Sequence, residues 1–491
     1  MNTVARSFRK ISPIVVLSAL SVAAGVAIVF LAQRLNFGLL LLLVATVPAG
    51  LYALSVLPLA GLKIRRLLGQ LRWWHLLWLM VFLSGLTFRV RETESIQENP
   101  FDPAAIFRVA LMGAVGLILL GVFSLRRHLG VINNLFRGLV GWVTAYAVIS
   151  VLSTLWSVYP PLTLYKSVEY LITVALIAGV VGSVRSTRDF KALFDWTWLL
   201  HGLLLFSVLM SIAIWPEYSI RSIPGGLGFL IMGVFPMIAH EGIGQTAAIL
   251  AVVSLNRLFS YQHSKRFYRA MFLISLSFMV LAQSRSAILA FFISIIVLFF
   301  MRRKSYNLVV IFILGIFSLL ILFLSNLPQY LLEFYMRGQS AEQFMMLSDR
   351  VIYWQISFSY ILSSLKSFFM GYGAYTGGRF LVSTFFDEIV FSSTHNTWVE
   401  TALGVGLVGL IPLTVAVFKT GRILARRSMI GLYYPDFLGD VLRREALCVL
   451  AILAVRSMFQ VMFIWHPALT WLLVLGYAEF LRRHHANRAH P

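Results

Sequence analysis

The chain has 491 residues, of which 59% are hydrophobic and only 12% are charged. A water-soluble domain of this length cannot bury so many apolar side chains, which excludes a soluble enzyme and indicates that lipid surrounds most of the chain. The formal net charge of +22 would suit a nucleic-acid-binding protein, but in a membrane protein lysine and arginine mark the loops that stay in the cytoplasm. We therefore predict a multi-pass protein of a bacterial inner membrane that binds no nucleic acid.

Several kinds of chemistry are excluded by missing motifs. The single cysteine, Cys448, rules out an internal disulfide and a cysteine-based metal site. There is no nucleotide-binding loop, no dinucleotide fingerprint and no Cys/His cluster with metal spacing. The first outer turn, around Arg34–Phe37, carries no carboxylate for a metal-assisted transferase. We expect no metal ion and no cofactor.

The hydropathy pattern predicts an all-α, polytopic transmembrane helix bundle of about 12–14 spans, since one crossing takes about 20 apolar residues. The first apolar run, Ile14–Ala32, has no small-residue cleavage pattern after it, so we predict a retained helix rather than a signal peptide. Fourteen crossings are predicted at residues 13–33, 37–59, 72–88, 104–124, 136–155, 162–184, 195–215, 227–259, 270–284, 286–301, 306–326, 396–418, 444–464 and 467–481.

The eighth of these segments, 227–259, is too long for one straight helix. Gly242 and Gly244 lie near its middle, where they predict a break, a re-entrant piece or a strong tilt.

The basic residues fix the orientation of these crossings. About 28 of the 41 lysines and arginines fall in the predicted inner segments, and every inner loop is basic. This distribution predicts that both termini are cytoplasmic.

The predicted outer connections differ from the inner ones. Residues 89–103 are acidic and polar, and residues 156–161 form a tight turn. Residues 327–395 form one large periplasmic loop, with an amphipathic stretch at 346–369 and a glycine-rich turn region, GYGAYTGG. We expect this loop to cap a cavity. No internal repeat is present.

The regions expected are N-terminal helices at 1–135, a central helical core at 136–326, the periplasmic loop at 327–395 and C-terminal helices at 396–491.

Most basic residues lie in the predicted inner loops, and the candidates for chemistry are polar or basic residues predicted at the outer face instead. Arg221 follows the seventh crossing, Arg285 lies in a very short outer turn, and His395 and Asn396 lie where the long loop re-enters the membrane. An arginine offers a planar, permanently charged fork to phosphate oxygens. A histidine can accept a proton near neutral pH. Together they would suit a substrate with a pyrophosphate and a reacting hydroxyl.

Each of these residues also has a purely structural interpretation. Arg221 can snorkel or cap a carbonyl, and Asn396 can cap the helix that begins at Thr397. Arg285 requires a partner at the interface, and His395 can be an ordinary loop histidine.

Other polar and small residues favour structural roles. Arg456 lies in mid-span and would pair with Glu400 or Glu169, or join the site. Lys166 and Glu169 are three residues apart on one helix and should pair with each other. The glycines of ALGVGLVG indicate close helix packing.

Taken in order, several segments resemble the family of O-antigen ligases, O-antigen polymerases and exopolysaccharide polymerases. The resemblance runs through about residues 150–420. It is carried by LSTLWSVYPPLTLYKSVEYL (152–171), GVFPMIAHEGIGQTAA (233–248), LAQSRSAILA (281–290), SDRVIYWQIS (348–357), GYGAYTGG (371–378) and THNTWVETALGVGLVGL (394–410).

The turn WSVYPP is more similar to the exopolysaccharide-polymerase branch than to the ligases. One departure is the triplet His240-Glu241-Gly242, where many members have His-Lys-Asn or a similar triplet, so no function is carried onto His240.

The resemblance implies a glycosyltransferase of membrane type that uses an undecaprenyl-pyrophosphate-linked oligosaccharide as donor. The acceptor would be a sugar hydroxyl on another lipid-linked glycan or on lipid A-core. The arginines that hold the pyrophosphate would be Arg221 and Arg285, and the essential loop histidine would be His395, with Arg350, Asn396 and Arg456 as possible support. Partners would include membrane lipid and chain-length-regulating and flippase proteins.

Several functions stay open at this stage. The first is a polymerase of lipid-linked repeat units that inverts the sugar configuration without a metal, and the second is an O-antigen ligase acting on lipid A-core. The third is a flippase or transporter of lipid-linked sugars, which would show charged residues along a central path and often repeat symmetry. A scaffold of an export complex is the least favoured.

Overall fold

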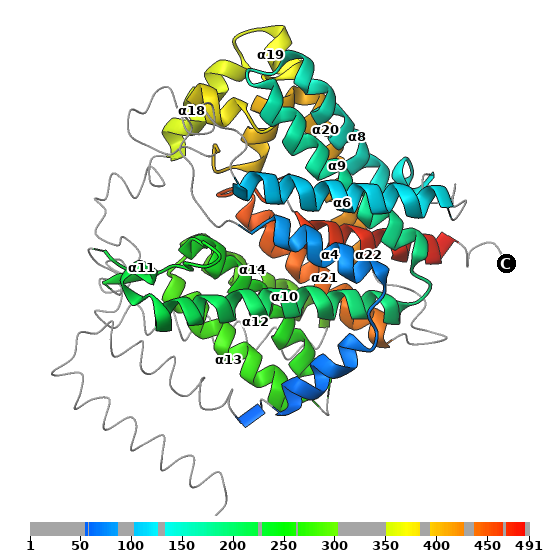
Figure 1. Ribbon diagram of the computed structural model, residues 1–491, viewed down its shortest axis with the longest axis vertical. Helices are drawn as coiled ribbons and strands as arrows, with labels where there is room; N and C mark the ends of the chain where they lie inside the picture. The colour runs from blue at the N-terminus through cyan, green and yellow to red at the C-terminus, as the bar shows by residue number, and fades with distance from the viewer. Residues whose placement is uncertain are drawn as a thin grey trace, which may run out of the picture.

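The protein was analysed as a computed structural model, which describes residues 55–56, 58–86, 103–125, 133–223, 228–261, 264–302, 350–382, 393–426, 437–464 and 468–486. Nearly all of these residues are helical (Figure 1). The predicted crossings 13–33 and 306–326, and most of 37–59, lie outside the described residues.

Seven of the described helices are long and apolar enough to cross a membrane. The chain is therefore an integral membrane protein, and the predicted all-α polytopic class is confirmed. The seven are α6 (Pro103–Leu125), α8 (Gly138–Leu152, continued by the 3-10 turn η2, Ser153–Trp156), α9 (Pro160–Ser183), α10 (Thr187–Ile214), α12 (His240–Ser260), α14 (Arg285–Arg302) and α20 (Thr397–Ala425).

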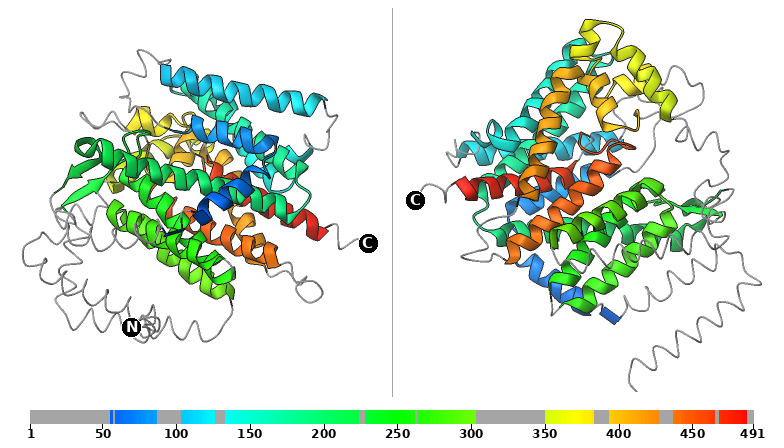
Figure 2. Two further views of the ribbon diagram at one scale, coloured as in Figure 1. Left: turned by 60° about the horizontal axis from the view of Figure 1, so that its bottom comes forward. Right: turned by 180° about the vertical axis from the view of Figure 1, so that it is seen from behind.

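Four more helices coincide with predicted crossings but are shorter or more charged. They are α4 (Trp73–Ser84), α13 (Lys265–Ala282), α21 (Phe437–Arg456) and α22 (Leu469–Ala486). In Figures 1 and 2, α12, α13 and α14 lie together on one side of the bundle, α8, α9 and α20 lie on the other, and α21 and α22 run between them.

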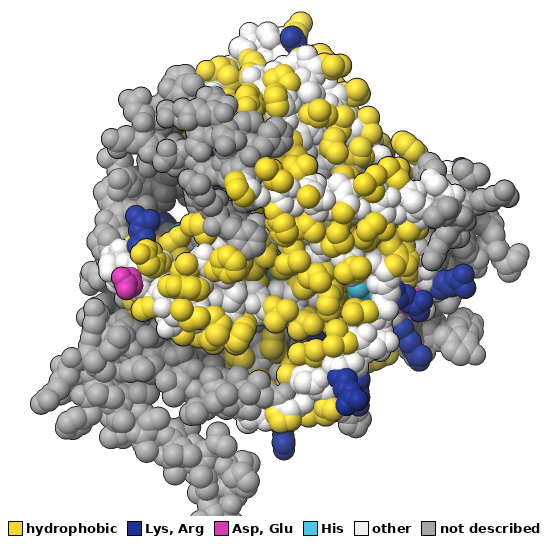
Figure 3. Space-filling view, viewed as in Figure 1, with side chains coloured by type: hydrophobic (Ala, Val, Ile, Leu, Met, Phe, Trp, Pro, Cys, Tyr) yellow, Lys and Arg dark blue, Asp and Glu magenta, His cyan; other side chains and the backbone are white. Residues whose placement is uncertain are grey.

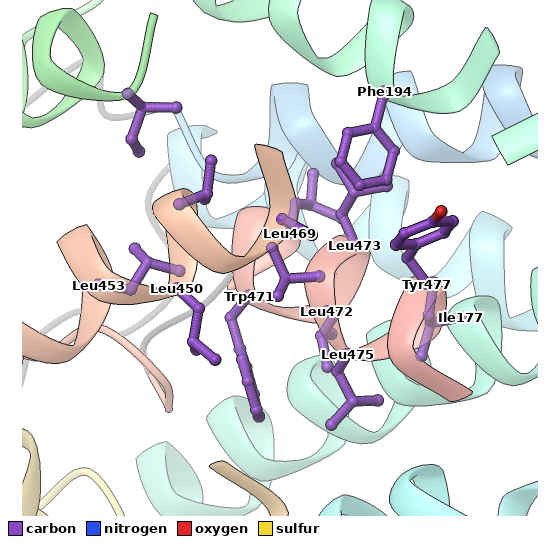
Figure 4. Close-up of a cluster of buried hydrophobic side chains, with 14 of the residues drawn as sticks. Ile177, Phe194, Leu450, Leu453, Leu469, Trp471, Leu472, Leu473, Leu475 and Tyr477 are labelled. Carbon is purple, nitrogen blue, oxygen red and sulfur yellow. The ribbon is translucent and has the colours of Figure 1, made fainter. Parts of the chain in front are cut away.

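Helix α22 forms the centre of the core. Trp471, Leu472 and Tyr477 are fully or almost fully buried and face side chains of α9, α10 and α21 (Figure 4). The Tyr477 hydroxyl donates a hydrogen bond to the Gly439 carbonyl at 2.9 Å, which satisfies its one polar atom in the apolar interior.

The outer surface of the bundle is apolar. On the face seen in Figure 3, hydrophobic side chains cover most of the described helices, and most of the visible lysines and arginines gather at one edge. Large exposed residues such as Leu117, Phe206 and Phe292 would be costly in water and are suited to lipid.

The segment 227–259 differs from the prediction. It begins with a strand, β2 (Phe229–Ile231), that pairs antiparallel with β1 (Ile220–Ser222), and a single helix, α12, starts only at His240. The segment is therefore not one straight helix, as predicted, but its helical part begins only at His240. A break at Gly242 and Gly244 was wrong, since both glycines lie inside regular helix. A methyl group on Gly244 would be 2.5 Å from the Ser284 Cβ, so this glycine allows α12 to pack closely against the α13–α14 turn.

The large predicted loop is described over residues 350–382 and 393–395. It contains α18 (Arg350–Ile361), α19 (Leu365–Met370) and a π-helical turn, η3 (Gly378–Val382). All three contact α20, so the part of the amphipathic stretch that is described packs on the bundle, at the upper end of Figure 1.

Helix α20 is bent by its glycines. Gly406 has φ +62° and separates two helical pieces. The Gly404 carbonyl accepts a hydrogen bond from the Gly373 N–H at 2.8 Å. Glycine is required at Gly406 because other residues rarely adopt positive φ. The glycines of ALGVGLVG thus do more than allow close helix packing, because Gly404 also contacts the GYGAYTGG segment.

Candidate functional site

A charged cluster forms where α12, α18 and α21 meet the loop before α20. At its centre is Glu241, in the first turn of α12, whose carboxylate pairs with the Arg350 guanidinium at 3.1 Å. A carboxylate is favoured near a helix N-terminus by the exposed backbone N–H groups. Arg350 begins α18, so this ion pair joins the large loop to the helix bundle.

Arg456 enters the same cluster from the end of α21. Its side chain is almost fully buried and donates hydrogen bonds to the Ser284 and Ser286 hydroxyls at 3.1 and 2.5 Å and to the Glu241 carbonyl at 3.2 Å. The predicted partners, Glu400 and Glu169, were wrong. The buried guanidinium instead donates to neutral oxygens, and among the described residues no carboxylate contacts it directly.

Arg285 lies between the two serines that Arg456 holds. It is partly buried and is the first residue of α14, directly after the short turn that Gln283 and Ser284 form. Arg456 therefore fixes the backbone that carries Arg285. That Arg285 and His395 act on one substrate stays a prediction.

His395 lies on the other side of the cluster. Its ring is 6.4 Å from the Tyr353 ring of α18, and its φ of +53° is a left-handed conformation in which histidine is more common than most side chains. Burial and the Arg350 guanidinium lower the pKa of the imidazole below its ordinary value, while the Glu241 carboxylate opposes that shift. The imidazole is thus neutral at neutral pH, as a proton acceptor must be.

The backbone around His395 is held on both sides. The Thr394 N–H donates to the buried Glu400 carboxylate at 2.8 Å, and the Thr394 carbonyl accepts the Trp354 indole N–H at 3.0 Å. Asn396 accepts the Trp398 and Val399 N–H groups at 2.9 and 3.2 Å. The prediction that Asn396 caps the helix is confirmed.

Arg221 lies outside the direct contacts of this cluster. It is exposed on β1, opposite Leu230, and within the described residues its side chain makes no hydrogen bond or ion pair. The hairpin is nevertheless attached to the Arg285 turn, because the Gln283 side-chain amide donates to the Phe229 carbonyl. The structure thus joins the segments of Arg221 and Arg285 without bringing the two side chains into contact with each other.

Glu241 was missed by the sequence interpretation. The sequence does contain an indication of its role. Glu241 is an acidic residue within the long apolar segment 227–259, where a charge is costly unless it has a partner.

No metal site accompanies the cluster in the described part of the chain, where no three His, Cys, Asp or Glu side chains gather. The chemistry available there is anion binding by guanidinium groups and proton acceptance by an imidazole.

One family model matches part of the chain. Residues 270–414 match the family model described as O-antigen ligase, a range that includes Arg285, Arg350 and His395. No curated protein matches the chain significantly. The match confirms the family resemblance expected from the motifs and supports glycosyl transfer of the O-antigen ligase and polymerase type.

Proposed function

We propose that the protein polymerises glycan repeat units carried on undecaprenyl pyrophosphate, at the periplasmic face of a bacterial inner membrane. The observation that carries the proposal is the arrangement of His395, Arg350 and Arg456 around Glu241, with the Arg285 turn hydrogen-bonded to Arg456. It gathers fixed cations and a neutral imidazole from segments far apart in the sequence.

In the proposed reaction, the arginines bind the pyrophosphate and His395 accepts the proton. Arg285, with Arg221 from the hairpin, would hold the donor pyrophosphate, and guanidinium groups in a low-dielectric site stabilise the charge that develops as it leaves. The acceptor oxygen bonds to the anomeric carbon while the carbon–oxygen bond to phosphate breaks, and the pyrophosphate takes the bonding electrons. His395 accepts the proton from the acceptor hydroxyl. A single displacement of this kind inverts the configuration at the anomeric carbon.

Glu241 and Arg350 act in opposite directions on the pKa of His395. The carboxylate lies beside the imidazole and the guanidinium, so it would stabilise the imidazolium once the proton has been transferred. Arg350 has the opposite effect and keeps the resting imidazole neutral.

A ligase that transfers finished glycan to lipid A-core is the second candidate, because the matching family model is described as O-antigen ligase. The two functions share the donor chemistry and differ in the acceptor.

The test uses the full chain, purified and reconstituted in proteoliposomes with lipid-linked repeat units extracted from a deletion strain. A polymerase extends these units into a ladder of products without any other acceptor. A ligase gives product only when lipid A-core is added. Absence of transfer under both conditions, with movement of the lipid-linked units between leaflets, would contradict the proposal and favour a flippase.

A further inference from the structure

The helix pair α18–α19 presents large apolar side chains on its outer face. Leu362 and Leu365 are 68% and 79% exposed, and Phe358 and Phe369 are exposed as well. Phe358 and Leu362 are four residues apart, as are Leu365 and Phe369, and residues at this spacing lie on the same side of a helix. We call these four residues the apolar stripe.

The inner face of the pair buries polar side chains. Ser357 and Ser367 are almost fully buried, and their hydroxyls donate hydrogen bonds to backbone carbonyls of the pair at 2.7 and 2.8 Å. A helix pair in water would turn its largest apolar residues toward the bundle and its serines toward the solvent. Here Leu362 and Leu365 face outward while two serines face inward, which indicates that an apolar phase covers the outer face.

Helix α19 lies beside a membrane-crossing helix and not beyond its end. A side chain at Gly406 of α20 would overlap the Phe369 carbonyl, so the two backbones are in contact. Gly406 is 19 residues before Ala425, the last residue of α20, which corresponds to about 29 Å of helix. Arg422 and Arg426 keep the Ala425 end at the opposite surface. Because the hydrocarbon core is about 30 Å thick, Gly406 and Phe369 lie no farther out than its near boundary.

The end of α8 indicates the same level for α19. The Trp156 indole, at the last position of the apolar crossing Gly138–Trp156, donates a hydrogen bond to the Met370 carbonyl at 2.9 Å. Tryptophan is enriched at the boundary between acyl chains and headgroups. Leu155 beside it is 83% exposed, so the lipid-facing surface of α8 continues onto α19. In Figure 3, hydrophobic side chains reach this upper end of the molecule.

We propose that α18 and α19 lie in the membrane surface at the end of the bundle that carries His395, with the apolar stripe among the phospholipid acyl chains. Because Arg350 begins α18, this anchor holds the candidate site near the level of the headgroups, where the pyrophosphate of a lipid-linked sugar lies. The proposal holds for a polymerase and for a ligase alike.

The exposed polar residues of the pair are compatible with this position. Lys366 is exposed beside the apolar stripe and can extend its ammonium group to the lipid phosphates. The exposed Ser359 and Ser363 hydroxyls donate to carbonyls three residues earlier in the chain at 2.7 and 2.8 Å, so they need no water. Gln355 is exposed in the first half of α18, nearer to Arg350 and the candidate site.

Fluorescence quenching of single labelled cysteines measures the depth of the apolar stripe in the full chain, reconstituted in phosphatidylcholine vesicles. The native Cys448 is buried and is replaced by alanine. Leu362→Cys and Leu365→Cys, labelled with bimane, should be quenched by phosphatidylcholine brominated on its acyl chains. The loss of fluorescence should match that of Leu117→Cys, a reference on the lipid-facing side of α6 that is 71% exposed. Iodide present on both sides of the membrane should quench them little.

Two further labelled positions are the controls. Arg188→Cys, at an exposed residue near the start of α10, is the water-facing reference and should be quenched mainly by iodide. Lys366→Cys lies off the apolar stripe and should be quenched less by the brominated lipid, and more by iodide, than its neighbour Leu365→Cys. A misfolded chain would not produce this difference between adjacent residues.

Two results would overturn the proposal. Iodide quenching of Leu365→Cys as strong as that of Arg188→Cys would place the apolar stripe in water. Protection of Leu365→Cys from both quenchers would mean that a second copy of the chain or another protein covers the stripe instead of lipid.

Discussion

The two ends of the helix bundle hold their buried arginines in different ways. At the predicted inner end, Arg257 is paired with Glu445 through two nitrogens at 2.8 Å and with Asp195 through the third at 2.5 Å, and Glu445 also accepts the Trp198 indole N–H. At the other end, Arg456 contacts two hydroxyls and a carbonyl, and no carboxylate from the part of the chain that the structure describes.

We interpret the Arg257 group as structural and the Arg456 group as part of the proposed site. The Arg257 guanidinium has each of its nitrogens on a carboxylate, so it has no capacity for a ligand and serves to join α10, α12 and α21. Among the described residues, the cluster at the other end places the Arg350 and Arg456 guanidinium groups around the single carboxylate of Glu241, close to the His395 imidazole. Such an arrangement suits an anionic substrate.

The largest effect is expected at Arg285. Replacing it with alanine should lower the rate of glycosyl transfer by about 100- to 1,000-fold, the typical loss when one preorganised donor to a developing anion is removed. The rate per folded molecule in proteoliposomes measures this. Arg285→Lys is the matched control for charge and should recover part of the rate, because lysine lacks the planar fork. An alanine variant with the normal rate would remove Arg285 from the site.

Arg257 should instead affect stability. Arg257→Ala leaves Glu445 buried without its guanidinium and should destabilise the fold by roughly 3–5 kcal/mol. Thermal unfolding of the detergent-purified chain checks this. The fraction that remains folded should transfer glycan at a nearly normal rate, and a loss of rate without a loss of stability would contradict the division between the two ends.

The pH dependence of transfer should shift in opposite directions at Glu241 and Arg350. Only neutral His395 can accept a proton, so the rate falls on the acid side as the imidazole protonates. Arg350→Gln removes a cation that lowers the His395 pKa, and the acid limb should move to higher pH. Glu241→Gln removes the carboxylate that raises this pKa, and the limb should move to lower pH.

A neutral change beside the same ring is the control for those two variants. Tyr353→Phe alters no charge and should leave the acid limb in place. Shifts of the same sign in Arg350→Gln and Glu241→Gln would show that the limb belongs to another group.

The smallest effect is expected at the helix cap. Asn396→Ala removes the acceptor for two backbone N–H groups and should destabilise the protein by about 1 kcal/mol. Asn396→Asp keeps the acceptor and should retain the stability in a urea or thermal unfolding series. Equal losses in both variants would mean that the cap contributes little.

Much of the fold could be predicted from the sequence, because lipid imposes strong constraints on it. Apolar runs and the positions of basic residues located α6, α8, α9 and α14 within a few residues. The β1–β2 hairpin was missed because β2 lies in a segment whose overall hydropathy resembles that of a span, and β1 is only three residues long in the connection before it. The kink at Gly406 was missed because a glycine that packs and a glycine that bends look alike in sequence.

The candidate site could be proposed from the sequence in part, for a different reason. His395, Arg285 and Arg350 lie in motifs that resemble a known family, and their types indicate the chemistry. Contacts between distant segments leave no local pattern, so the partners of Arg456 were predicted wrongly and Glu241 was overlooked.

The rate of glycosyl transfer by His395→Ala tests the central claim most directly, with purified chain in proteoliposomes and lipid-linked glycan as the substrate. If His395 is the proton acceptor in the cluster around Glu241, transfer per folded molecule should fall by about 100-fold or more, while binding of farnesyl pyrophosphate is retained. A variant that transfers glycan at the normal rate would contradict the account.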